Sequence, residues 1–283
     1  MATGVRQDPV PFTVEPVSGL ELSGEAAGEG SPLILLHGLT ATRRNVLQGS
    51  RHLLSRGRRL VSYDARGHGE SSPAPSPDGY EYTDLALDLS AVAGSLGLDR
   101  FAVAGSSMGA ATAVRFALEH PGRLSTLVLI TPAYAGAGKL DASALTQWDE
   151  RAAALEAADI DRFVIATGVD DLPERWREPA RIATRQRIER HRNLSAVVQA
   201  VRVVPHSVAF NDLTDLAQID VPTLIVGSRD SADPGHPLAI AEEYARRIPS
   251  AELAVEDEGD TPLAWQGARL SRAIGDFLER AQV

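Results

Sequence analysis

The chain has 283 residues, 43% of them hydrophobic, which is enough for one large core or for a core with an added lid. Its net charge of −10 argues against general nucleic-acid binding, and its lack of cysteine excludes disulfides, thiol nucleophiles and thiolate metal sites. The sequence contains no run of about 18 apolar residues and no apolar core of a signal peptide, so we expect a cytoplasmic protein without a membrane partner.

Strand-like and helix-like segments alternate along the chain. Residues 11–28 alternate in polarity around turn glycines, which predicts an antiparallel edge hairpin. After it, short apolar runs alternate with amphipathic segments, which is typical of a parallel sheet covered on both faces. The strands are expected within residues 31–38, 58–67, 100–107, 124–133, 221–230 and 251–259, and the helices within 42–57, 82–98, 109–120, 237–248 and 263–281.

One long segment interrupts this alternation. Residues 134–210 have helical periodicity and no strand signal. A helical insertion between two parallel strands is expected over the carboxyl ends of the strands, where ligands bind. We therefore predict a mostly parallel, doubly wound α/β core formed by residues 1–133 and 211–283, with residues 134–210 as an inserted helical cap.

The segment "GSSMG" carries the strongest chemical signal. Residues 105–109 form a G-x-S-x-G motif between a predicted strand and a predicted helix, which is the context of a nucleophile elbow. The two glycines allow the tight turn, and the turn exposes Ser107 in front of the helix N-terminus. The alternative is a tight turn with an idle serine. The Met108 N–H, together with the Leu39 N–H of "HGLT", would form an oxyanion hole. We expect His37 and Gly38 to shape that loop, and we do not interpret His37 as a base.

Four segments, "HGLT", "YDARGHGESS", "GSSMGA" and "VPTLIVGSRD", occur in this order. As a set they resemble the α/β-hydrolase superfamily, in its capped branch of esterases, lactonases and C–C bond hydrolases. The similarity covers residues 11–278 apart from the cap. It implies a doubly wound α/β fold and a nucleophile, an acid and a histidine in that chain order, and it is only weakly specific for the substrate.

The resemblance leaves one catalytic position open. It assigns the acid to Asp230, in a G-x-x-D-x-x-x-P pattern, with Asp233 as a competitor. The histidine should follow the last strand, but that turn reads "EDEGDTPLAW" and has Asp260 instead. Aspartate is a poor base for a serine hydroxyl at neutral pH. Another histidine has moved in, or the protein binds a ligand without hydrolysis, or Asp260 is an engineered replacement.

Among the seven histidines, His236 is the best candidate for the base. It lies on the same loop as Asp230, although this loop usually packs to the side of the nucleophile. His52, His120 and His191 have the pattern of solvated positions, and His206 lies where the cap returns to the sheet. We also expect Asp260 to lie between Ser107 and Asp230, paired with Arg229 or His236, because two adjacent carboxylates cannot both ionise cheaply.

The cap contains a run of arginines, at positions 177, 181, 185 and 192, whose spacing suggests one face of a helix. A solvated outer face is the favoured interpretation, and a carboxylate-binding face is the alternative. Trp148 and Trp176 are expected to pack within the cap. The sequence thus predicts a serine-dependent hydrolase of an ester, lactone or related acyl substrate, or alternatively a catalytically impaired or non-hydrolytic protein of this fold that binds a small-molecule ligand. We expect no metal and no cofactor, and the sequence leaves the oligomeric state open.

Overall fold

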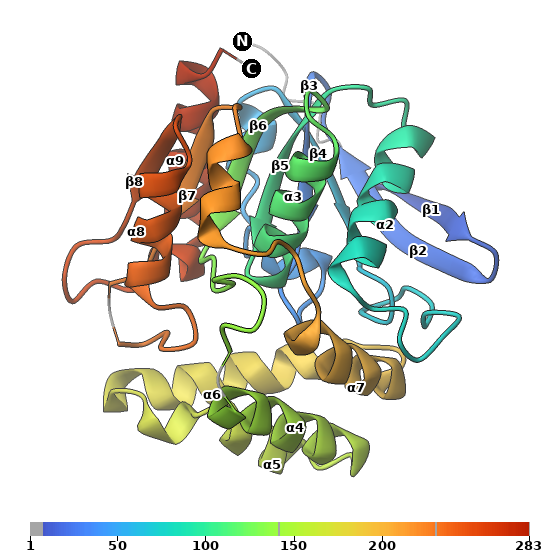
Figure 1. Ribbon diagram of the computed structural model, residues 1–283, viewed down its shortest axis with the longest axis vertical. Coiled ribbons are helices and arrows are strands. Elements are labelled where there is room, and N and C mark those ends of the chain that lie inside the picture. The colour runs from blue at the N-terminus through green and yellow to red at the C-terminus, as the bar shows by residue number, and fades with distance from the viewer. Residues whose placement is uncertain (1–7, 141, 230, 283) are drawn as a thin grey trace.

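The computed structural model describes residues 8–140, 142–229 and 231–282. In these ranges the chain forms one eight-stranded sheet in the order β1-β2-β4-β3-β5-β6-β7-β8 (Figure 1). The strands are β1 (Val10–Val17), β2 (Leu20–Ala27), β3 (Ser31–Leu36), β4 (Arg58–Tyr63), β5 (Phe101–Ser106), β6 (Leu124–Ile130), β7 (Thr223–Val226) and β8 (Ala251–Ala254).

The first two strands form the predicted antiparallel hairpin at one edge. β1 pairs antiparallel with β2, and β2 pairs antiparallel with β4. All pairings from β4 through β8 are parallel. The prediction of a mostly parallel α/β sheet with an edge hairpin is therefore confirmed. The chain moves outward from β3 to β4 and then returns to place β5 on the other side of β3, so the carboxyl ends of β3 and β5 border the crevice of the fold.

Helices cover both faces of the sheet (Figure 1). The side chains of β3 alternate between two clusters, with Ile34 and Leu36 on one face and Leu33 and Leu35 on the other, because successive residues of a strand point to opposite faces. The first face packs against α2 (Tyr82–Ser95), α3 (Met108–Glu119) and α8 (Leu238–Arg247), and the second against α1 (His52–Ser55) and α9 (Gly267–Arg280).

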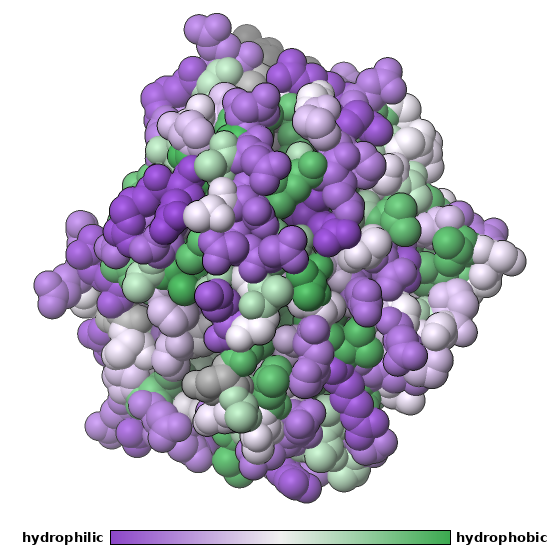
Figure 2. Space-filling model, in the orientation of Figure 1, coloured by the Kyte–Doolittle hydropathy of each residue, from purple (hydrophilic) through white to green (hydrophobic). Residues whose placement is uncertain are grey.

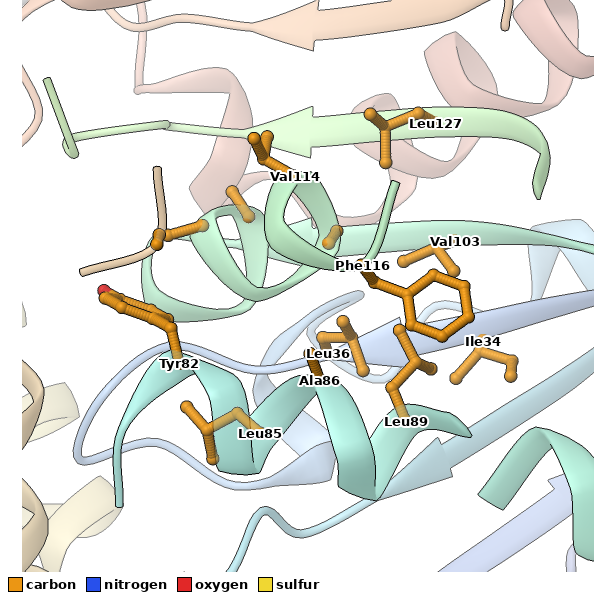
Figure 3. Close-up of a cluster of buried hydrophobic side chains, with 14 of the residues drawn as sticks. Ile34, Leu36, Tyr82, Leu85, Ala86, Leu89, Val103, Val114, Phe116 and Leu127 are labelled. Atoms are coloured by element: carbon orange, nitrogen blue, oxygen red, sulfur yellow. The ribbon is translucent and has the colours of Figure 1, made fainter. Parts of the chain in front are cut away.

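Figure 3 shows the packing on the α2–α3 face. Leu85 and Leu89 of α2 are one helical turn apart and belong to the same buried cluster as Ile34 and Leu36, with Leu89 beside the Phe116 ring. The Phe116 ring of α3 lies between α2 and the sheet, and its centroid is 5.7 Å from that of the Phe101 ring. Small residues elsewhere on α3 let this helix lie close to β5, which places the N-terminus of α3 directly after the strand.

The segment between β6 and β7 forms a separate layer of helices at one end of the sheet (Figure 1). Its helices share a small core of their own, which includes Leu155, Phe163, Ile188 and Val201. The boundaries at residues 134 and 210 and the role as a cap remain predictions. The helices are α4 (Ala142–Glu156), α5 (Ile160–Ala166), α6 (Glu174–Ile188) and α7 (Leu194–Val203).

The face of the molecule in Figure 2 is mostly hydrophilic, with apolar residues scattered among charged ones. Over the residues that the structure describes, no helix combines the length and the apolar character needed to cross a bilayer.

Candidate active site

Ser107 lies at the turn between β5 and α3 with φ 52° and ψ −109°. A positive φ is strained for a residue with a side chain, and such strain is concentrated at functional sites. A Cβ on Gly105 would lie 2.2 Å from the Gly109 carbonyl oxygen, and one on Gly109 would lie 2.4 Å from that of Leu36. The motif therefore needs both glycines. A side chain on Gly109 would meet the neighbouring strand β3, and one on Gly105 would meet the start of α3.

The Ser107 hydroxyl has an imidazole within hydrogen-bond reach. His236 Nε2 lies 2.8 Å from Ser107 Oγ, and His236 Nδ1 lies 2.7 Å from Asp233 Oδ1. A carboxylate only accepts hydrogen bonds, so the proton of the neutral ring sits on Nδ1 and Nε2 is left to accept from the serine hydroxyl. The structure thus brings together a hydroxyl, an imidazole and a carboxylate in the order that nucleophile activation requires.

The surroundings of His236 act on its basicity in opposite directions. Burial lowers its pKa, but the attraction and the hydrogen bond of Asp233 outweigh burial, so the pKa of His236 lies above its ordinary value. The charges of Arg187 and Arg151, which come from the helical layer, lower the pKa of the same ring. His236 can therefore accept a proton, and its tendency to do so depends on a balance between one anion and two cations.

A short turn holds His236 and Asp233 together. The His236 N–H donates to the Asp233 carbonyl at 3.0 Å, which closes a β-turn over residues 233–236. The buried carboxylate of Glu256, at the end of β8, braces this loop near its start. It accepts from the Ser228 hydroxyl at 2.9 Å and the Arg229 N–H at 2.7 Å, and it also accepts from the Leu263 N–H at 3.1 Å. Glu256 thus ties the loop after β7 to the loop after β8.

Asp260 is held by a different cation from the two expected. Its carboxylate pairs with Arg269 of α9 at 2.9 Å, and its side chain is 47% exposed. The expectation of Arg229 or His236 as the partner is wrong, because Arg229 Nε donates to the Glu256 carbonyl and His236 bonds to Ser107 and Asp233. Within the described ranges Asp260 has no hydrogen bond to those two residues. Asp230 lies outside the described residues, so its assignment as the acid stays a prediction.

The expected oxyanion loop runs beside the serine. A Cβ on Gly38 would lie 3.5 Å from Ser107 Cβ, so glycine lets this backbone approach the nucleophile. The Leu39 N–H has no acceptor in the part of the chain that the structure describes. Met108 is the first residue of α3, where N–H groups have no intrahelical acceptor. The N–H groups of Leu39 and Met108, which the sequence predicts as oxyanion-hole donors, therefore have no protein acceptor in the described ranges. The oxyanion hole itself stays a prediction.

The rings of His37, His68 and His191 support the loop that carries Gly38 and Leu39. The ring of His68 lies 5.1 Å from that of His37 and 5.5 Å from that of His191, between centroids. His37 Nε2 accepts from the Ala65 N–H at 2.9 Å, which agrees with a bracing role rather than a base. His191 Nδ1 accepts from the Gly69 N–H at 2.8 Å, which makes its Nε2 the donor to the Thr40 carbonyl at 3.0 Å. The interpretation of His191 as a solvated residue is therefore wrong.

Burial keeps these rings neutral. It lowers the pKa of His37, lowers that of His68 well below its ordinary value, and lowers that of His191 to about 4. A neutral His191 can accept from Gly69 while it donates to Thr40, whereas a protonated ring could only donate. The link between the end of α6 and the oxyanion loop therefore depends on neutral imidazole.

The charged turn after β4 is a second brace. Asp64, which is 1% exposed, accepts from the backbone N–H groups of Arg43 at 2.7 Å and Glu70 at 3.0 Å and forms an ion pair with Arg43. Arg66 forms a buried bidentate pair with Asp88 of α2, at 2.8 and 2.7 Å. These contacts hold the loops around the serine in place.

Two of the cap arginines singled out in the sequence face away from the serine. Arg181 pairs with Asp170 and Arg185 with Asp161, on a groove of about 580 Å³ between α5 and α6 that contains none of Ser107, His236 and Asp233. Of the remaining two, Arg177 lies on α6, where its Nε donates to the Leu172 carbonyl, and Arg192 follows the end of that helix. The solvated outer face is confirmed for Arg181 and Arg185.

The two tryptophans both pack within the helical layer, and Trp176 makes a further contact. Trp176 packs against Val164, Val169 and Leu172, and its ring also lies 5.8 Å from that of Trp265, between centroids, so it joins α6 to the segment after β8. The Trp148 ring lies 4.4 Å below the Arg151 guanidinium, inside that layer. No cluster of three or more potential metal ligands occurs among the residues that the structure describes.

The family model for the alpha/beta hydrolase fold matches residues 31–266, which is most of the chain. The chain belongs to the α/β-hydrolase family. The AB hydrolase superfamily protein YisY of Bacillus subtilis is 30% identical over 239 residues, which cover 81% of this chain and 84% of that protein. A thermophilic esterase from Thermogutta terrifontis has a TM-score of 0.77 and 27% identity, over 98% of this chain and 100% of the esterase. An esterase from Exiguobacterium antarcticum has a TM-score of 0.76, 23% identity and coverage of 95% and 100%, and its likeness concerns the fold alone. A hydrolase role follows from the family.

Proposed function

We propose that the protein is a serine-dependent hydrolase of an ester, lactone or related acyl substrate. The observation that carries the proposal is the 2.8 Å contact between His236 Nε2 and Ser107 Oγ, with Asp233 on the opposite nitrogen. This arrangement provides the base that the turn at Asp260 lacks. Asp260 at the expected histidine position was the reason to favour a protein that binds its ligand without hydrolysis. With an imidazole beside Ser107, that reason no longer applies.

In the proposed mechanism Ser107 Oγ attacks the carbonyl carbon while its proton passes to His236 Nε2. The carbonyl oxygen takes up the negative charge, and the N–H groups of Leu39 and Met108 stabilise it. His236 then gives the proton to the leaving oxygen, and an acyl-enzyme forms on Ser107. Water repeats the sequence, with His236 as its base, and releases the acid. Asp233 stabilises the imidazolium and keeps its orientation without taking the proton.

The first test is labelling with a fluorophosphonate followed by peptide mass analysis. We expect the label on Ser107, because the elbow exposes this hydroxyl and places a base beside it. A label on Ser106 alone would overturn the assignment.

The second test compares His236→Gln, Asp233→Ala and His206→Gln with an activated ester. We expect turnover to fall by a factor on the order of a million for His236→Gln and by at least about a thousandfold for Asp233→Ala. His206 is exposed at the end of the helical insertion, so its variant is the matched control and should keep its activity. Equal activity of all three variants would contradict the proposed roles.

A further inference from the structure

Two arginines of the helical layer direct positive charge at the proposed catalytic group. The charge of Arg187, on α6, is attracted to Asp233 and acts on His236 and His191. The charge of Arg151, on α4, also acts on His236. Neither arginine has an anionic hydrogen-bond partner within the described part of the chain.

The position of α6 explains why Arg187 faces inward. One end of the helix is held by Trp176 against Trp265, and the segment after its other end is held by His191, which bonds to Thr40 and Gly69. The helix therefore crosses from the loop after β8 to the oxyanion loop.

Helical spacing then separates the two kinds of arginine on α6. Arg187 is three residues after Thr184 and next to Ile188, both of which are buried. Arg185 is on the opposite side and lines the outer groove, where it pairs with Asp161. The run of arginines identified in the sequence did not include Arg187.

The Arg187 Nε–H is completely buried and has no acceptor in the described ranges. Arg151 Nε donates to the Ala166 carbonyl at 2.9 Å, which leaves its terminal nitrogens without an acceptor in those ranges. Burial lowers the pKa of both guanidinium groups, and the attraction of Asp233 for Arg187 and of Glu150 for Arg151 offsets that effect only in part. In contrast, Arg43, Arg66 and Arg185 each have a carboxylate partner.

The negative net charge of the chain makes two cations near His236 an exception that calls for an explanation. The chain carries a net charge of −10, so its surface as a whole repels an anion. Two cations that act on His236 and have no hydrogen-bonded carboxylate in the described ranges are a local exception to that negative charge. A planar guanidinium group matches a carboxylate through two parallel hydrogen bonds, and such pairs are strong where water is excluded.

We propose that Arg187 and Arg151 form an anion subsite that binds a carboxylate of the substrate, so that the acyl substrate of Ser107 carries a free carboxylate in addition to the bond that is cleaved. This inference rests on the proposed function. It names the class of substrate as half-esters and lactones that retain a carboxylate group.

The experiment uses pairs of 4-nitrophenyl esters of glutaric, adipic and pimelic acid. In each pair the far end is either a carboxylate or the matching neutral carboxamide, so the two esters differ in charge and hardly in size. We expect the native protein to favour the carboxylate ester of at least one length by about tenfold or more in kcat/KM.

Arg187→Gln should remove that preference. It should lower kcat/KM for the carboxylate ester by about 10- to 100-fold and leave the carboxamide ester within about threefold. Arg187→Lys should restore part of the preference, because it keeps the charge but not the planar fork. Arg185→Gln on the outer face of the same helix is the matched control and should change neither ester.

The stability of Arg187→Gln separates binding from a structural role. Removal of a partly buried charge that has no hydrogen-bonded carboxylate partner should leave Tm unchanged or raise it. A lower Tm, or an equal loss for both esters of every pair, would overturn the inference.

A titration that needs no turnover distinguishes this inference from the proposed function. In a Ser107→Ala variant, calorimetry with monoethyl adipate should show binding that is weakened at least about tenfold by Arg187→Gln. If the carboxylate binds in this way but the native protein takes no fluorophosphonate label, the proposed function fails and the subsite stands. Inhibition by inorganic phosphate that exceeds inhibition by adipate would overturn the assignment to a carboxylate.

Discussion

Protonation of His191 should destabilise the protein as the pH falls from about 6.5 toward 4. The pKa of this ring is lowered from 6.5 to about 4, chiefly by burial and in spite of its hydrogen bond to the Thr40 carbonyl. The unfolded chain therefore binds more protons than the folded chain between these two values. The contribution of His191 to stability is complete above about pH 6.5 and is lost as the pH falls through this window.

A shift of that size corresponds to about 3 kcal/mol, of which about 2 kcal/mol should be lost between pH 7 and pH 4.5. His191→Gln removes the titrating group and keeps a side chain that can accept and donate. The free energy of unfolding of the native protein and of the variant, measured in urea at a series of pH values, should thus converge by about 2 kcal/mol as the pH falls to 4.5.

The exposed His206 supplies the matched control, because His206→Gln also removes one imidazole. Its stability is expected to follow that of the native protein with pH. Curves for native protein and His191→Gln that stay parallel from pH 7 to pH 4.5 would refute the reasoning, because they would mean that His191 is not held neutral by its surroundings.

Three further outcomes follow from the contacts described above. Asp88→Ala should lower the free energy of unfolding by about 3–5 kcal/mol, because it removes the buried bidentate partner of Arg66 and leaves the more exposed Asp84 as its carboxylate; a loss below 1 kcal/mol in urea unfolding would contradict this. Gly109→Ala should cost about 1–3 kcal/mol and reduce turnover, since its Cβ meets the Leu36 carbonyl at 2.4 Å, whereas Gly94→Ala in α2 has open space and should stabilise by roughly 0.5–1 kcal/mol. Asp260→Ala should change stability by at most about 1 kcal/mol and activity by less than about threefold, because its ion pair is half exposed, and a hundredfold loss of activity would place Asp260 in the reaction.

Local patterns were sufficient to predict most of the core. The alternation in residues 11–28 predicted the hairpin of β1 and β2, and the short apolar runs predicted the parallel strands that follow. These patterns work because each strand must be apolar on the faces it buries, which is a property of neighbouring residues. For the same reason the strand–glycine–serine–glycine–helix order predicted the strained turn at Ser107, which only this local geometry requires.

Tertiary structure decided which histidine contributes the imidazole beside Ser107. The turn after β8 has Asp260 where a histidine was expected, and the sequence favoured His236 among the seven histidines only because it lies on the same loop as Asp230. His236 reaches it because β7 ends two strands away from β5 in the sheet and because Glu256 and the turn at Asp233 fix the path of the loop. Those contacts join residues far apart in the chain, so no periodicity reports them.

The arginines of the helical layer likewise show what the sequence predicts and what only packing decides. Sequence spacing identified a helix with charged faces, but it could not distinguish the face toward solvent from the face toward Ser107. The anchoring of α6 at its two ends sets the rotation of the helix, and this rotation places Arg185 on the outer groove and Arg187 where its charge acts on Asp233 and His236. The sequence determined which residues can form helices, strands and a strained turn. Only the packing of those elements decided which charges act on His236, because the direction of a side chain from a helix depends on what the helix is packed against.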